Sequence, residues 1–99
     1  MPNIISGQVN PDGSINQGTG FAVAHNSAGS YTISFNTAFN APPAVSATQI
    51  APQDVHVQCA GLVTITPSSV TIFFENVSNY SYYDTGFTFI AVETAPGES

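Results

Sequence analysis

The chain contains no lysine and no arginine, whereas six residues are aspartate or glutamate, so that the formal net charge is -6. Binding to nucleic acid and to anionic lipid depends on these cations, which neutralise phosphate groups and release their counterions. We therefore expect no nucleic-acid partner. The sequence also has no apolar stretch of membrane-spanning length, and we expect no membrane insertion.

Charged side chains of either sign are scarce, at 6% of the residues, although 42% of the residues are hydrophobic as in other folded proteins. Solubility must then come from serine, threonine, asparagine and glutamine. Such hydroxyl and amide groups suit sugar hydroxyls, ordered water or a neighbouring protein. Because charges normally guard sheet edges against association, we expect other subunits to cover the edges here.

Cys59 is the only cysteine, which excludes an intrachain disulfide. It ends the apolar run Val55–Cys59, and we interpret it as a small core residue. A reactive thiolate needs a positive neighbourhood, for which this chain has no lysine or arginine. An intermolecular disulfide is the remaining alternative.

Residues that bind metals are few and scattered. His25 and His56 are far apart in the sequence, and His56 and Cys59 point to opposite faces of a strand because they are three residues apart. Calcium bound by aspartates is the one alternative left open, although no dense carboxylate loop is present. We expect no metal and no cofactor.

Signals for catalysis are equally sparse. A serine nucleophile needs a base and an oxyanion hole, and glycoside hydrolysis needs a defined pair of carboxylates. No spacing in the chain singles out such a set, so we expect no enzymatic activity. The start, Met1–Ile4, has neither a basic segment nor an apolar one, so we expect no signal peptide. We expect the protein to lie at an extracellular or virion surface.

Apolar residues alternate with polar ones at a period of two through most of the chain, and no helical period is visible. The apolar faces are Phe21 and Val23; Tyr31, Ile33 and Phe35; Val45, Ala47 and Gln49; Val55 and Val57; Val63 and Ile65; Val70, Ile72 and Phe74; and Phe87, Phe89 and Ala91. Turn residues separate these runs at 11–14, 26–30, 40–43 and 66–69, and Ala60-Gly61 indicates a bulge. The pattern predicts an all-β fold, an antiparallel β-sandwich of about six or seven strands. We expect one domain over residues 1–99, with a flexible tail at 95–99.

The last predicted strand is apolar on both faces. Phe87 and Phe89 lie on one side, and Ile90 and Val92 lie on the other. We therefore expect this strand to be central in its sheet or to lie at a subunit interface. Either pair is a candidate for contact with a neighbouring subunit.

Core positions along most of the chain resemble the H-type lectin domain of snail agglutinins and discoidins. The residues that carry the resemblance are Ser6-Gly7-Gln8-Val9; Ile33, Phe35, Phe39, Pro42, Pro43 and Val45; Thr66-Pro67; and Ile90-Ala91-Val92-Glu93. The segments Gly18–Phe21 and Tyr31–Phe35 are also similar to heads of bacterial and phage fibre proteins. Both resemblances imply a trimeric assembly, and the first implies an H-type lectin-like sandwich that binds sugar.

The sequence departs from the H-type lectin pattern at the sugar site. The family's site depends on a Trp-His pair, an arginine on the preceding strand and a tyrosine. An ungapped comparison puts Val77-Ser78 in place of the Trp-His pair and Gly61 in place of the arginine, while Tyr83 keeps the tyrosine. The family's sugar specificity therefore does not carry over.

The segment between the last two predicted strands, 76–84, combines tyrosines with amide and carboxylate side chains. Its candidate sugar-binding residues are Asn76, Ser78, Asn79, Tyr80, Tyr82, Tyr83 and Asp84. Aromatic faces stack on the C–H groups of sugars, and amides and carboxylates hold sugar hydroxyls; the same mixture is found in protein-binding loops. The alternative is that the tyrosines cover the core or an interface and keep their hydroxyls at the rim.

Two classes of function fit these observations. The first is a non-catalytic, lectin-like module that forms a homotrimer, or a multiple of one, and binds glycan or cell-surface carbohydrate in recognition or adhesion. The second is a structural, oligomerising head or subunit of a phage or extracellular fibre, without sugar binding.

Overall fold

The computed structural model describes residues 4–50 and 56–94, and every regular element within them is a strand. The strands are β1 (Ile4–Val9), β2 (Ile15–Gln17), β3 (Phe21–Ser27), β4 (Ser30–Phe35), β5 (Ala44–Ile50), β6 (Val57–Val63), β7 (Ser69–Asn76) and β8 (Gly86–Val92). No helix of the described part has the length and hydrophobicity of a membrane span. The all-β class is confirmed, and the tail expected at 95–99 lies outside the described residues.

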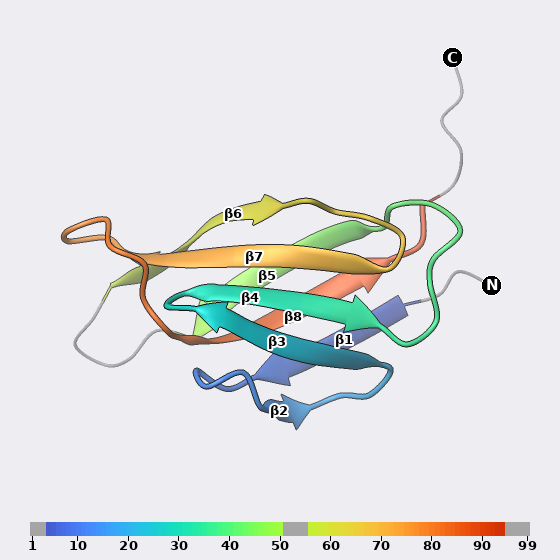
Figure 1. Cartoon of the computed structure of the whole chain (residues 1–99), viewed down its shortest axis with the longest axis horizontal. Helices are drawn as coiled ribbons and strands as arrows, with labels where there is room; N and C mark the ends of the chain where they lie inside the picture. Colours follow the sequence, from blue (N-terminus) through green and yellow to red (C-terminus); the bar gives the residue numbers. More distant parts are fainter. Residues whose placement is uncertain (1–3, 51–55, 95–99) are drawn as a thin grey trace, which may run out of the picture.

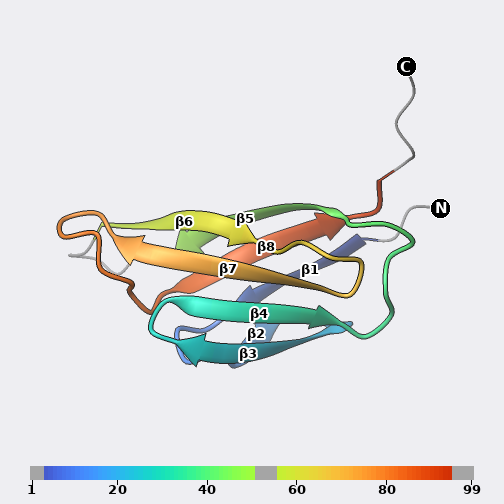
Figure 2. The same cartoon turned by 45° about the horizontal axis from the view of Figure 1, so that its top comes forward.

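The strands form two four-stranded antiparallel sheets, in the orders β2-β1-β8-β5 and β3-β4-β7-β6. Figure 1 shows the second sheet in front of the first, and Figure 2 shows the two layers from a direction turned by 45°. This is the expected antiparallel sandwich. The eight strands exceed the expected six or seven because β2 has only three residues, too few to show an alternating pattern.

The core lies between the two sheets and is formed by the side chains that point inward from both of them. Its buried hydrophobic residues are Val9, Phe21, Tyr31, Ile33, Phe35, Phe39, Val57, Val70, Ile72, Phe74, Phe87, Phe89 and Ala91. Aromatic rings form much of the contact between layers: the ring centroids of Phe74 and Phe87 are 4.8 Å apart. The alternation in the sequence therefore predicted most of these core positions.

Turn and bulge signals also match the structure. Gly13 and Gly29 adopt positive φ in the two hairpin turns that the sequence indicated. The pairing of β6 with β7 shifts register between Cys59 and Gly61, which confirms the predicted bulge. The expectation that Val63 and Ile65 share a core face is wrong. Val63 is exposed and Ile65 packs on the core, because β6 ends at Val63 and Thr64 has a φ of 56°.

β8 lies between β1 and β5, so that the strand with two apolar faces is central in its sheet. Phe87 and Phe89 are buried between the layers. On the opposite face Ile90 is 42% exposed and Val92 is partly exposed. Ile90 and Val92 are thus the apolar residues of this strand that can face a neighbouring subunit.

Gly7 is required by a close approach between the sheets. A Cβ atom at this position would lie 2.4 Å from the ring of Phe21 and 2.8 Å from the backbone oxygen of Gln17. Replacing Gly7 by alanine is therefore expected to lower the free energy of unfolding by about 1–2 kcal/mol, since overpacking outweighs the reduced entropy of the unfolded chain.

Urea denaturation measures this change, and Gly61→Ala is the matched control. A Cβ atom at Gly61 has no neighbour within 4 Å, so the control is expected to leave stability unchanged or slightly higher. Equal effects of the two substitutions would contradict the steric requirement for glycine at position 7.

Candidate functional site

The candidate loop between β7 and β8 is held in shape by its own asparagines. The Asn76 side-chain oxygen accepts a hydrogen bond from the Ser78 amide at 2.8 Å, and the Asn79 side-chain oxygen accepts one from the Ser81 amide at 3.0 Å. The Asn76 amide donates to the Ser81 carbonyl at 2.8 Å, which closes the base of the loop. The side-chain oxygens of both asparagines thus serve the turn, and their amide NH₂ groups are the part left for a ligand.

Tyr80 stands at the tip of this loop, where 71% of its surface is exposed. Its φ is 58°, a left-handed conformation that costs a tyrosine on the order of 1 kcal/mol. Its amide donates to the Asn76 carbonyl at 2.7 Å, a bond that fixes the strained conformation. The loop therefore presents an aromatic ring to solvent at a position that backbone energetics would give to glycine or asparagine.

Tyr82 returns from the loop to the outer face of the β3-β4-β7-β6 sheet. It forms an isolated antiparallel bridge with Glu75, so the two side chains lie side by side on one face. Its ring contacts Phe73, with centroids 5.4 Å apart, although Tyr82 remains 57% exposed. Two aromatic rings thus meet on the outside of the sandwich rather than in its core.

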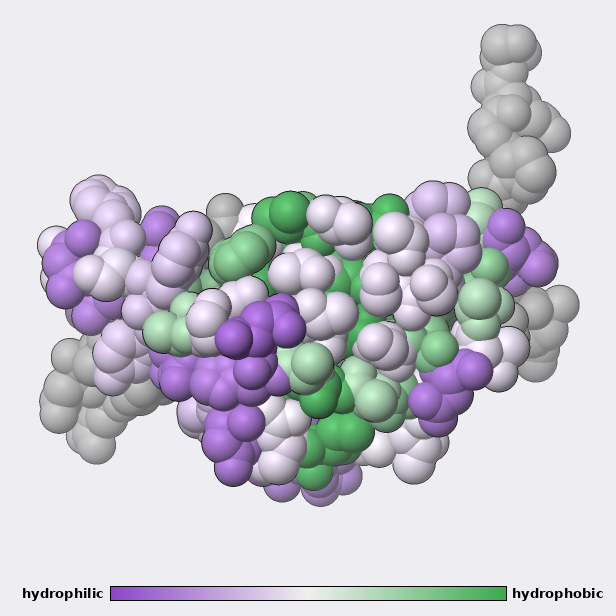
Figure 3. Space-filling model, viewed as in Figure 1, coloured by the Kyte–Doolittle hydropathy of each residue, from purple (hydrophilic) through white to green (hydrophobic). Residues whose placement is uncertain are grey.

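A polar pair borders these rings. Gln58 of β6 donates to the Glu75 carboxylate at 2.6 Å, and Glu75 lies between Gln58 and Tyr82 across the sheet. Gly61 of β6 lies opposite Phe73, and a Cβ atom added at Gly61 would have no neighbour within 4 Å. We call Gln58, Gly61, Phe73, Glu75 and Tyr82 the aromatic patch. Figure 3 shows the sheet that carries the patch from outside, with near-neutral and apolar side chains over β6 and β7.

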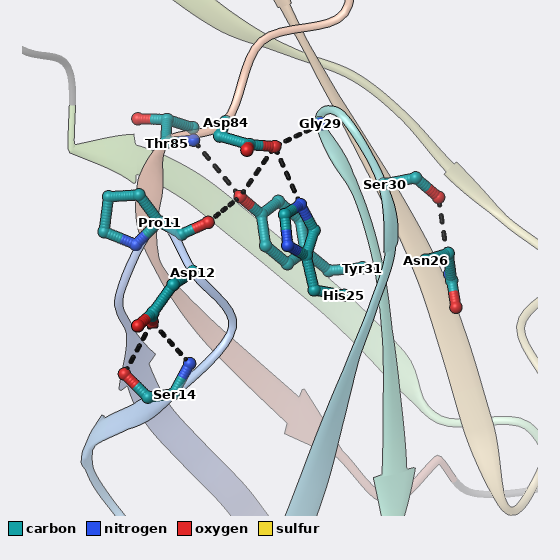
Figure 4. Close-up of polar contacts among 10 residues, drawn as sticks. All are labelled: Pro11, Asp12, Ser14, His25, Asn26, Gly29, Ser30, Tyr31, Asp84 and Thr85. Carbon is teal, nitrogen blue, oxygen red and sulfur yellow. Dashed lines mark hydrogen bonds and ion pairs between the residues drawn. The ribbon is translucent and has the colours of Figure 1, made fainter.

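The last two candidate residues, Tyr83 and Asp84, turn away from the aromatic patch. Tyr83 packs against the core, and its amide donates to the Phe74 carbonyl at 3.1 Å. Asp84 accepts hydrogen bonds from the Gly29 amide at 2.7 Å and from the His25 imidazole at 2.8 Å (Figure 4). Both residues therefore hold the end of the sandwich together. Of the other candidates, Ser78 is exposed in the loop.

Tyr31 and Asp84 join three loops at this end of the fold. The Tyr31 hydroxyl donates to the Pro11 carbonyl at 2.6 Å and accepts from the buried Thr85 amide at 3.3 Å. Its distance to Asp84 is 3.5 Å, so the hydroxyl proton goes to Pro11. We call Tyr31, Asp84 and His25 the latch. It connects the β1–β2 turn, the β3–β4 turn and the start of β8.

The latch shifts the pKa values of two of its members. Burial raises the pKa of Tyr31 to about 12, and the nearby Asp84 carboxylate adds to the shift. Partial burial by itself raises the pKa of Asp84, but hydrogen bonds from the Gly29 amide and from His25 outweigh it. The pKa of Asp84 therefore lies below the ordinary aspartate value, and Tyr31 stays protonated. These shifts fit a structural role, since Tyr31 is fully buried.

Cys59 and Asp12 make contacts with the core and within a turn, respectively. Burial raises the pKa of the Cys59 thiol, which packs partly against the core as expected. No group of three or more His, Cys, Asp or Glu side chains in the described ranges could hold a metal ion. Asp12 has its carboxylate bound to the Ser14 amide at 2.9 Å and to the Ser14 hydroxyl at 2.6 Å. Asp12 thus stabilises its own turn.

Sequence reasoning identified Tyr82 but missed its partners Gln58, Phe73 and Glu75. The signal for Phe73 was present, because it is the one aromatic residue on the polar side of the alternating run Val70–Glu75. The bulge at Ala60-Gly61 hides the position of Gln58, since register across a bulge does not follow from spacing. The contact between Tyr82 and Phe73 needs the return path of the loop, which no pattern in the sequence predicts.

Comparisons with protein-family models, with curated proteins and with solved structures find no match to this chain. The resemblance to H-type lectins therefore stays a hypothesis from sequence.

Proposed function

We propose that the protein is a non-catalytic carbohydrate-binding module that acts as a homotrimer in recognition or adhesion. The observation that carries the proposal is the contact on the outer face between the exposed Tyr82 and the partly exposed Phe73, beside Glu75 and Gln58. Aromatic faces exposed to solvent stack on the apolar face of a pyranose ring. The carboxylate and amide beside them offer acceptors and donors to its hydroxyls.

The surroundings of the patch suit a chain of sugars better than a single small molecule. The next row of the sheet carries hydroxyls and an amide: Asn26 donates to Thr32 at 2.8 Å, and Thr32 lies 3.1 Å from the Thr71 hydroxyl. An extended glycan lying across the sheet would meet these groups after the aromatic pair.

Replacing Tyr82 by alanine is expected to weaken glycan binding about thirtyfold, which corresponds to about 2 kcal/mol for an exposed aromatic contact residue. A glycan array on the wild type identifies a ligand, and calorimetry with that ligand measures the loss. Ile15→Ala is the control, because it removes a similarly exposed apolar side chain from the other sheet, β2-β1-β8-β5. Wild-type and Tyr82→Ala proteins with equal affinities would exclude the aromatic patch as the site.

The second candidate function is a structural head or subunit of a fibre assembly that binds no sugar. The outer face of β1, β8 and β5 favours it, since the paired rows Ile4-Val92-Ala44, Ser6-Ile90-Ser46 and Gln8-Thr88-Thr48 contain no charge. Such a face is suited to contact with another copy of the chain. An array without specific hits, together with a stable oligomer in solution, would favour this function.

A further inference from the structure

We infer that the aromatic patch takes a cationic glycan, an oligomer of protonated 2-amino-2-deoxyhexose, in preference to its neutral N-acetylated counterpart. The inference rests on the proposed function and names the class of sugar for the same site. It depends on three features: the acceptor groups of the patch, its aromatic rings and the charge of the whole chain.

The hydrogen-bonding groups of the patch are mostly acceptors. Gln58 donates one amide hydrogen to a Glu75 oxygen. The second carboxylate oxygen and the remaining lone pairs can therefore accept hydrogen bonds from a ligand, and the Gln58 carbonyl oxygen is a further acceptor. The hydrogen bond also fixes the direction of the carboxylate, which is half-buried and held between two strands. An ammonium group has three donors and no acceptor and is complementary to this arrangement.

The aromatic rings add a second attraction for a positive charge. Tyr82 lies opposite Glu75, and Phe73 lies two residues before it on the same face. A cation bound to the carboxylate is thus placed near both rings. A cation that lies over a ring face is stabilised by the quadrupole of the ring. Gly61 lies opposite Phe73, and a Cβ atom added there would have no neighbour within 4 Å, so β6 places no side chain beside Phe73 at this position.

The charge of the chain acts in the same direction over longer distances. With no lysine or arginine and a formal charge of -6, the protein has no permanently charged side-chain cation to neutralise Glu75. A cationic oligomer is drawn toward such a molecule, and an anionic glycan is repelled. The lack of lysine and arginine, which argues against a nucleic-acid partner, therefore also favours cationic glycans over anionic ones.

The test compares two probes of equal length and linkage, a glucosamine hexamer and an N-acetylglucosamine hexamer. Calorimetry is carried out in a mildly acidic buffer that keeps the amines protonated, at low and at high salt. The wild type is expected to bind the glucosamine hexamer about tenfold more tightly at low salt, and salt is expected to reduce this ratio. Equal affinities for the two probes at low salt would overturn the inference and leave the proposed function standing.

The variants Glu75→Gln and Glu93→Gln distinguish the effect of the aromatic patch on binding from the effect of net charge. Both remove one carboxylate, but Glu93 lies away from the patch and accepts a hydrogen bond from Asn40. Glu75→Gln is expected to bring the ratio of the affinities for the two hexamers close to one, while binding of the neutral hexamer persists. Glu93→Gln is expected to leave this ratio of affinities unchanged. Equal effects of the two variants would overturn the inference, because general attraction would then explain the preference.

Two further arms complete the test. Gly61→Arg places a cation beside Glu75 where an added Cβ has no neighbour, and it is expected to abolish the preference even if Glu75→Gln does not fold. Hexalysine is expected to bind at least tenfold more weakly than the glucosamine hexamer. Hexalysine binding of equal strength and equal dependence on Glu75 would show a site for cationic peptides and overturn the inference. Failure of both hexamers and of every arrayed glycan would overturn the proposed function as well.

Discussion

Replacing Ile90 by aspartate is expected to convert the proposed trimer to monomers. Ile90 lies in the middle row of the outer face of β8, with Ser6 on one side and Ser46 on the other. A carboxylate buried at this position in each subunit would lose its hydration without gaining a cation, because the chain has no lysine or arginine to pair with it. Light scattering at micromolar concentration measures the change.

The same face explains why Ile90 is the position to test. Ile4 is 58% exposed and pairs with Val92, which pairs in turn with Ala44, so that an apolar row crosses three strands next to Ile90. Apart from Ile90, the rows through Ile90 and Thr88 hold only small or neutral polar residues, and a face without charge places no like charges directly against a second copy. Contact between copies would remove this apolar surface from water.

Ser34→Asp is the matched control for Ile90→Asp. Ser34 is exposed at the outer face of β4 in the other sheet, and the substitution adds the same charge there. The control is expected to stay trimeric. A wild-type protein that is monomeric at micromolar concentration would end the trimer hypothesis, and dissociation by both variants would place the interface elsewhere.

The sequence predicted the core of this fold well because the physical rule behind it is local. Residues such as Ile33 and Ile72 alternate with polar neighbours, and burial of one face of a strand requires that pattern whatever the topology. The bulge at Ala60-Gly61 was found for a similar reason, since glycine interrupts an apolar run. β2 and the change of face after Val63 were not predicted, because each depends on a short pairing or on one dihedral angle.

The candidate site was only partly predictable, because composition does not say which way a side chain points. Tyr82 and Asp84 are two residues apart in a segment rich in polar and aromatic groups. One stacks on Phe73 outside the sheet, and the other accepts hydrogen bonds from Gly29 and His25 at the end of the sandwich. Their separate roles follow from partners that lie nine and more than fifty residues away. Spacing within the segment holds no information on such partners.

Replacing Tyr31 by phenylalanine is expected to lower the free energy of unfolding by about 3 kcal/mol. The substitution keeps the buried ring and its stacking on His25, whose centroid lies 4.8 Å away, but removes the hydroxyl. The Pro11 carbonyl then loses its donor, and the Thr85 amide loses its acceptor in a residue that is fully buried. An unsatisfied buried donor such as the Thr85 amide costs more than the hydrogen bond contributed, and the lost bond to the Pro11 carbonyl adds to the effect. Urea denaturation at neutral pH measures it.

Tyr80→Phe is the control for the lost hydroxyl, because Tyr80 is exposed and its hydroxyl has water as an alternative partner. It is expected to leave stability unchanged. Equal stabilities of Tyr31→Phe and the wild type would contradict the role of the latch in joining the Pro11 and Thr85 segments.

The pH dependence of stability distinguishes the two halves of the latch. The pKa of Asp84 is lower in the folded chain than in the unfolded chain, because the Gly29 amide and His25 stabilise the carboxylate. Its contribution is therefore fully present above the unfolded pKa and is lost as the pH falls through the folded pKa. Asp84→Asn is expected to be less stable than the wild type at neutral pH, with the difference shrinking in acid. Tyr31→Phe is expected to stay less stable than the wild type even in acid, because a neutral phenol makes the same bonds to Pro11 and Thr85 throughout this range. A difference between wild type and Asp84→Asn that stays constant from neutral to acid pH would show that the charge of Asp84 does not hold the three loops together.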